Sequence, residues 1–184
     1  MQISIHKSNV FKLASTGMLT AVGILIPMFF PKIMIGPASY TLASHVAIFI
    51  AMFISPGVTA GVVVGTTAGF LLGGFPLVIV FRAASHVLWA LPGAFYLSKT
   101  DKLNASWYIL RVFSVVIALI HGVCELGAVL LFYTGTSFPV GIDFLWVLSF
   151  ICLGTIVHSL IDFEISNAVR LVLQKQTKFK ELAR

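Results

Sequence analysis

The sequence has few charged residues and almost no cysteine. Aspartate, glutamate, lysine and arginine make up 10% of its 184 residues, whereas a soluble domain has about 25%. Hydrophobic residues make up 59%, which is typical of a chain surrounded mostly by lipid. Cys124 and Cys152 lie inside long apolar runs and indicate neither a disulfide framework nor a zinc motif. The composition therefore indicates an integral membrane protein.

Catalytic and nucleotide-binding motifs are also missing. The sequence contains no P-loop, no Gly-x-Ser-x-Gly and no His-Glu-x-x-His. At about 20 apolar residues per crossing, the chain has room for about six helices and for no separate ATPase domain. We therefore expect a chain that is not an enzyme and carries no cofactor.

Proline and glycine divide the apolar sequence into segments. The turns Ser55-Pro56-Gly57 and Gly74-Phe75-Pro76 each end one segment and begin the next. We predict an all-α integral membrane fold, a single domain over residues 1–184, with six transmembrane helices in a compact bundle. The expected helices cover approximately residues 10–30, 45–54, 58–73, 77–98, 107–133 and 144–172. Residues 31–44, with two prolines, are expected to form an apolar outer loop.

The distribution of cations predicts the topology. With six helices, one side of the membrane holds both termini, and nine cations fall there: Lys7, Lys12, Lys99, Lys102, Arg170, Lys175, Lys178, Lys180 and Arg184. The loops of the other side, 31–44, 74–76 and 134–143, contain one cation, Lys32. Because cytoplasmic loops carry the excess of lysine and arginine, both termini are expected to be cytoplasmic. The net charge of +6 is therefore a topology signal, and we expect no nucleic-acid partner.

Small residues recur at helical spacing in two places. Glycines at 57, 61, 65, 69 and 73 form a stripe that allows close helix packing, mainly within the bundle. Ala14, Gly17 and Ala21 form a shorter stripe in the first helix, where contact with a partner protein is more plausible.

Ionisable residues at bilayer depth are the candidates for a binding site. Arg82 and His86 are four residues apart, roughly 9 and 15 Å from the outer end of their helix. Glu125 and His121 are also four apart, roughly 12 and 18 Å from the outer end of theirs. These four groups predict a pocket open to the outside and closed by the loop 31–44.

Other interpretations of these residues stay open. Arg82 either binds an anionic ligand group or pairs with Glu125, and each histidine either contacts ligand or is a core histidine. Asp162 and Glu164, further along the sixth helix, are expected at the cytoplasmic interface, and Arg111 is expected to snorkel to the same surface. Histidine and Glu125 can in principle ligate a divalent ion, but the neighbouring Arg82 cation argues against it, so no metal site is expected.

Two stretches carry a family resemblance. GPASYTLASHVAIFIAMFISP, from Gly36 to Pro56, and GFPLVIVFRAASH, from Gly74 to His86, resemble the niacin-specific branch of the substrate-binding S components of energy-coupling factor (ECF) vitamin transporters. The resemblance implies capture of a vitamin outside a prokaryotic cytoplasmic membrane. It also implies a transmembrane T component and two cytoplasmic ATPases as partners. The T component contacts an Ala-x-x-x-Ala motif, to which Gly17-x-x-x-Ala21 is a near match.

Niacin, a pyridine ring with a carboxylate, suits the candidate residues. Arg82 would bind the carboxylate, His86 or His121 the ring nitrogen or the second carboxylate oxygen, and Glu125 would fix the histidine tautomer. The other candidates are the wall residues Trp89, Tyr40 and Phe75, and the histidines His45 and His158. Another carboxylated vitamin such as pantothenate is the alternative ligand. The alternative of another class is a structural or assembly subunit of a membrane complex.

Overall fold

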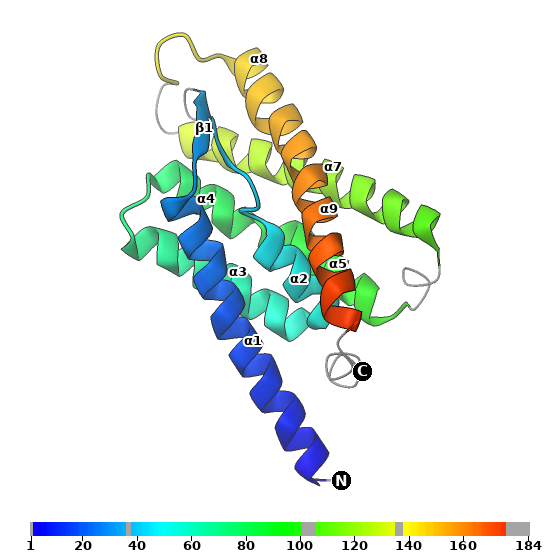
Figure 1. The fold of residues 1–184 in the computed structure, drawn as a ribbon. Coiled ribbons are helices and arrows are strands. Elements are labelled where there is room, and N and C mark those ends of the chain that lie inside the picture. The colour runs from blue at the N-terminus through cyan, green and yellow to red at the C-terminus, as the bar shows by residue number, and fades with distance from the viewer. Residues whose placement is uncertain (1, 36–37, 101–105, 135–137, 176–184) are drawn as a thin grey trace.

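The structure is a computed structural model that describes residues 2–35, 38–100, 106–134 and 138–175. Its long helices pack side by side into one bundle, with α1 along one side of it (Figure 1). The helices are α1 (Gln2–Phe29), α2 (Val46–Ile54), α3 (Pro56–Leu72), α4 (Leu77–Ser85), α5 (Val87–Ser98), α7 (Trp107–Tyr133), α8 (Phe144–Trp146) and α9 (Gly154–Lys175). A π-helical segment, Val147–Leu153, joins α8 to α9.

Four helical segments are long and apolar enough to cross a membrane. They cover Asn9–Phe29, Leu77–Ser98, Trp107–Tyr133 and Phe144–Leu173. The other two expected helices are shorter, since α2 has 9 residues and α3 has 17. The short α2 is apolar on all sides and lies in the centre of the bundle, in contact with α1, α3, α5 and α9. The chain is therefore a mainly helical, membrane-embedded protein.

The glycine stripe of α3 packs against α1. A Cβ added to Gly61 would lie 2.6 Å from Cγ2 of Thr16, and one added to Gly65 would lie 2.6 Å from Cγ2 of Thr20. Glycine is therefore needed at these positions for the two helices to approach this closely. The prediction that the stripe packs inside the bundle is confirmed for Gly61, Gly65 and Gly69, whereas Gly57 has open space around it.

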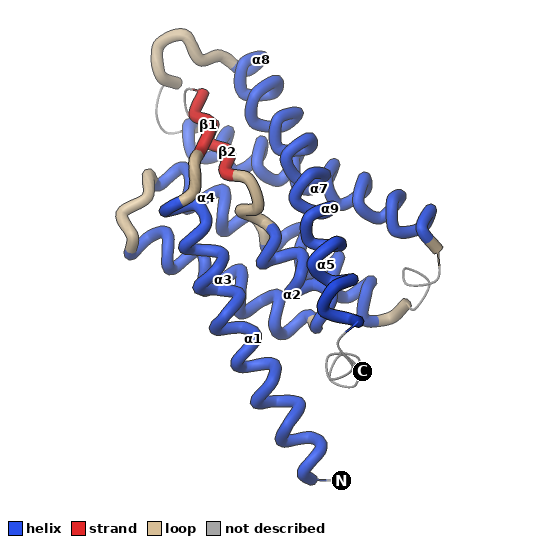
Figure 2. The backbone as a smooth tube through the Cα atoms, viewed as in Figure 1, coloured by secondary structure: helices blue, strands red, loops and turns tan. Residues whose placement is uncertain are grey.

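Residues 32–35 and 38–41 form the two strands of a β-hairpin where an irregular loop was expected. Strand β1 (Lys32–Ile35) pairs antiparallel with β2 (Ala38–Thr41), as Figure 2 shows. In this pairing Lys32 lies opposite Thr41. The tip, residues 36–37, lies outside the described residues. Isoleucine, tyrosine and threonine favour this extended pairing, and the prolines at 31 and 37 lie outside the strands. The hairpin leads directly from α1 toward α2.

The expected helix 77–98 is interrupted at His86. The α4 helix ends at Ser85 and α5 begins at Val87, and the backbone N–H of His86 donates to the carbonyl of Ala83, three residues back. The chain therefore has one tighter, three-residue turn at His86, which lies in the bundle interior.

Candidate functional site

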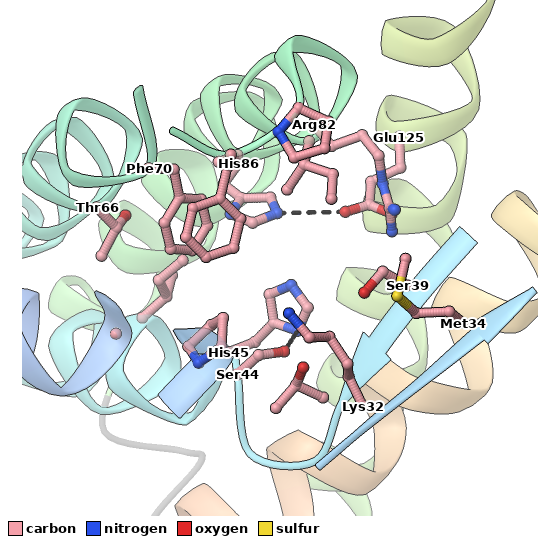
Figure 3. A pocket seen from close by; sticks show the side chains of 18 residues that line it. Lys32, Met34, Ser39, Ser44, His45, Thr66, Phe70, Arg82, His86 and Glu125 are labelled. Carbon is pink, nitrogen blue, oxygen red and sulfur yellow. Dashed lines mark hydrogen bonds and ion pairs between the residues drawn. The ribbon is translucent and has the colours of Figure 1, made fainter. Parts of the chain in front are cut away.

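A cavity of about 140 Å³ lies between the hairpin, α1, α3, α4 and α7. One water needs roughly 10–15 Å³ of such space, so the cavity has room for a small single-ring molecule. Figure 3 shows Arg82, His86 and Glu125 along one wall, with Lys32, Ser44 and His45 across the cavity from them. The structure thus brings five of the sequence-predicted site residues to one cavity: His45, Phe75, Arg82, His86 and Glu125.

Arg82 and Glu125 form a buried ion pair at this wall. Nε and Nη2 of Arg82 donate to Oε2 of Glu125 at 3.1 and 2.7 Å, and the hydroxyl of Thr155 donates to the same oxygen at 2.6 Å. Both charged side chains are buried, with 6% of Arg82 and 2% of Glu125 exposed. Of the two interpretations of Arg82, the structure therefore contains the pair with Glu125. Its charge is compensated before any ligand arrives.

Three histidines from different parts of the chain, His86, His121 and His158, gather around His45. The ring of His45 lies 4.9 Å from that of His86, 4.7 Å from that of His121 and 5.1 Å from that of His158. Trp89 stacks on His121 with centroids 4.4 Å apart. His121 and Trp89 are fully buried behind the cavity wall and do not line it.

Asp162 is a member of this site, and its expected place at the cytoplasmic interface is wrong. Its carboxylate is fully buried and accepts the backbone N–H groups of Ala43 and His45 at 2.8 and 2.9 Å. The expectation failed because depth was counted along one helix, whereas the turn after β2 runs into the bundle and meets α9 at Asp162. Glu164, by contrast, pairs with Arg111, and both side chains are partly exposed.

Asp162 also connects two histidines. His45 Nδ1 lies 3.1 Å and His158 Nε2 lies 3.2 Å from Oδ2 of Asp162. The carboxylate meets the backbone N–H groups just before α2, where a negative charge is favourable. Asp162 therefore fixes the hairpin end of α2 to the middle of α9.

Tyr40 and His158 lie next to each other, outside the lining of the cavity. Tyr40 is on β2, its ring lies 5.6 Å from that of His158, and neither residue lines the cavity. Burial raises the pKa of Tyr40 to about 12, so its hydroxyl stays protonated at neutral pH. The aromatic wall is formed by Phe70 and Phe75, which stack with centroids 4.6 Å apart.

Sequence reasoning missed the contribution of the hairpin. Lys32, Met34 and Ser39 line the cavity, and the Lys32 ammonium lies 5.8 Å from the centre of the Phe75 ring. Apart from Arg82, Lys32 is the one lysine or arginine among the lining residues that the structure describes. The signal was present, because Lys32 is the single cation of the three outer loops.

The expected partner-contact residues lie on the outer surface of α1. Ala14, Gly17 and Ala21 are exposed, and a Cβ added to Gly17 would have no atom within 4 Å. Exposed Leu13, Met18 and Leu25 continue the same apolar surface. This part of α1 is not used for packing within the bundle.

Fold and cavity together define a helical membrane protein with a small cavity beneath a hairpin, lined by both apolar and charged residues. No family model matches the chain, and no solved structure matches it significantly. Over 171 residues the chain is 39% identical to the niacin transporter NiaX of Lactococcus lactis subsp. cremoris (strain MG1363), a match that covers 92% of this chain and 77% of the relative. The chain therefore belongs to the family of that transporter. This confirms the resemblance to the niacin branch of ECF S components and makes the chain a transport protein rather than an enzyme.

Proposed function

We propose that this chain is the niacin-binding S component of an ECF-type uptake transporter in the cell membrane. The observation that carries the proposal is the 39% identity to a niacin transporter along 92% of the chain. The cavity supports it, because the size and the mixture of aromatic and charged lining residues suit an aromatic carboxylate.

The structure modifies the proposed binding of the carboxylate. Arg82 is held by Glu125 through Nε and Nη2, so its positive charge is already balanced. Lys32 faces the same cavity from the hairpin and brings a cation without a carboxylate partner among the described residues. We therefore assign Lys32 the main charge interaction with the carboxylate, with Arg82 as a further donor.

The other walls of the cavity match the pyridine ring of niacin. Phe70 and Phe75 offer an aromatic surface, and His45 or His86 offers a nitrogen to the pyridine nitrogen. Niacin has about nine heavy atoms, and the best small ligands gain about 1.5 kcal/mol per atom, so tight binding requires nearly complete burial. The hairpin over the cavity supplies that cover.

The proposal includes a topology and partners. Six helices with both termini in the cytoplasm place the hairpin on the outer side, from which the vitamin enters. The exposed surface of α1 around Gly17 would contact the T component, and two cytoplasmic ATPases would supply the energy. The surface supports this assignment because its small residues have no packing role inside the bundle.

Calorimetric titration of the purified chain with niacin, nicotinamide and pantothenate tests the proposal. We expect saturable binding of niacin, much weaker binding of the uncharged amide, and no binding of the longer pantothenate, because the cavity fits one ring. Tight binding of pantothenate instead would identify a different carboxylated vitamin. A folded chain that binds none of the three would contradict the proposal and favour a structural subunit.

A further inference from the structure

Three histidines and a glutamate point toward one position beside the cavity. His45 precedes α2, His86 lies between α4 and α5, and His121 and Glu125 lie one turn apart on α7. All four are buried, and each offers one ligand atom that lies within 4.8 Å of the other three. Imidazole nitrogen with a carboxylate oxygen is a ligand set that zinc, cobalt and nickel ions prefer.

The separations fit an ion better than direct hydrogen bonds. Oε1 of Glu125 lies 3.4 Å from Nε2 of His86 and 3.5 Å from Nε2 of His121. Good N–H···O hydrogen bonds are about 2.7–3.2 Å long. Two atoms that each ligate a tetrahedral zinc ion at about 2.1 Å lie about 3.4 Å apart.

One of these nitrogens is buried without a partner. Nε2 of His121 has no hydrogen-bond partner among the described residues, and no part of the residue is exposed. An unpaired polar atom in such a place is costly, so it calls for an explanation. A metal ion would give Nε2 of His121 the missing partner.

In two of the proposed ligands, His121 and His45, the opposite ring nitrogen is held by a second group. Nδ1 of His121 lies 3.1 Å from the Ser159 hydroxyl, and Nδ1 of His45 lies 3.1 Å from the Asp162 carboxylate. Such outer contacts fix the orientation of metal-ligating histidines. Asp162 already accepts two backbone N–H groups, which suits this supporting role better than that of a ligand.

The neighbouring Arg82 does not prevent an ion from binding. Arg82 donates to Oε2 of Glu125, whereas His86 and His121 face Oε1, so the carboxylate separates the guanidinium from the cluster. With neutral imidazoles, the buried charged groups Arg82, Glu125 and Asp162 together leave a net charge of minus one beside the histidines, which favours a cation.

We propose that His45, His86, His121 and Glu125 bind one divalent transition-metal ion such as zinc, cobalt or nickel. This departs from the sequence-based expectation of no metal, because the sequence did not show that Glu125 lies between Arg82 and the histidines. The ion would border the cavity, since His45, His86 and Glu125 also line it. If the proposed function is correct, the bound ion replaces His45 and His86 as the group that meets the pyridine nitrogen, and it adds positive charge to the cavity.

The test uses the full chain, purified in detergent through a tag without histidine and stripped with a chelator. Cobalt(II) is titrated in, and its visible d–d absorption and the bound metal per chain are measured. We expect saturable binding of one ion per chain, its displacement by zinc, and an increase in the melting temperature. A folded wild-type chain that binds no cobalt or zinc would overturn the proposal.

Variants separate this site from adventitious binding. His121→Ala and the isosteric Glu125→Gln should each weaken cobalt binding at least tenfold. His121→Asn, which leaves the Arg82–Glu125 pair intact, gives the same test if either variant does not fold. His6→Ala, which removes the remaining one of the five histidines, should bind as the wild type does. Unchanged binding by Glu125→Gln together with loss in His6→Ala would overturn the proposal.

Niacin titration of the stripped and the loaded protein keeps the two proposals apart. Failure of both forms to bind niacin would contradict the proposed function and leave the metal result unaffected. Binding of niacin without stoichiometric metal binding would overturn the metal site alone.

Discussion

Replacing Lys32 by methionine tests whether the hairpin supplies the charge that recognises the ligand. Methionine keeps much of the apolar stem of lysine and removes the ammonium group. The residue lies on the exposed strand β1, where it supports no buried hydrogen bond, so the fold should be unaffected. Removing Arg82 would be a poorer test, because it also leaves the buried Glu125 carboxylate without its partner.

The size of the effect follows from the two cations at the cavity. Arg82 is neutralised by Glu125, so the carboxylate of niacin gains its main attraction from Lys32. A hydrogen bond to a charged group contributes about 1.5–3 kcal/mol, and the solvent exposure of Lys32 brings the value to the low end. We expect a loss of about 1.4 kcal/mol, which is a tenfold increase in Kd.

Isothermal titration calorimetry of the wild type and the variant, with niacin and nicotinamide, measures this change. Nicotinamide binding should change less than twofold, because the amide carries no charge. The control variant is Lys99→Met, which makes the same change of charge at the exposed end of α5, outside the cavity. Wild-type affinity of Lys32→Met for niacin, or an equal loss for both ligands, would refute the assignment.

Three further substitutions test the packing of the interior by thermal and chemical unfolding in detergent. Arg82→Ala should destabilise the protein by about 3–5 kcal/mol because it leaves Glu125 buried and unpaired. Adding Glu125→Gln to this variant should recover part of the lost stability. An unchanged melting temperature of the Arg82→Ala variant would contradict the ion pair. Asp162→Ala should lower the free energy of unfolding by about 1–3 kcal/mol for each of the two backbone N–H groups that lose their acceptor. If Asp162 were at the membrane interface instead, the substitution would leave the stability almost unchanged. Gly65→Val should destabilise the contact between α1 and α3 by more than about 1 kcal/mol, because the added side chain overlaps Thr20. Gly57→Ala should have no such effect, because a Cβ added there has no atom within 4 Å. Equal effects of the two substitutions would argue against the close approach of the helices.

Much of the site was predictable because it follows helical spacing. Arg82 with His86, and His121 with Glu125, are pairs four residues apart in apolar helices, and such pairs lie on one helix face. The cost of burying ionisable groups in lipid then indicates that the pairs face inward. The structure places all four within one cluster.

The other site residues, Asp162 and Lys32, reach the site through the way the chain folds back on itself. The spacing of residues along one helix does not reveal this. Asp162 was assigned to the surface because its depth was counted from the outer end of its own helix. Its partners, Ala43 and His45, come from a turn that enters the bundle from the hairpin. Lys32 was overlooked for a related reason, since only the pairing of β1 with β2 brings the start of that segment over the cavity.

The two ends of the hairpin are attached to different parts of the bundle. Its first strand begins three residues after the last residue of α1, and its second strand leads into the turn that Asp162 holds against α9. A displacement of α1 relative to α9 must therefore stretch or tilt the hairpin. A protein that pushes on the outer surface of α1 would move the cover of the pocket directly, without changing the helices that carry the histidines.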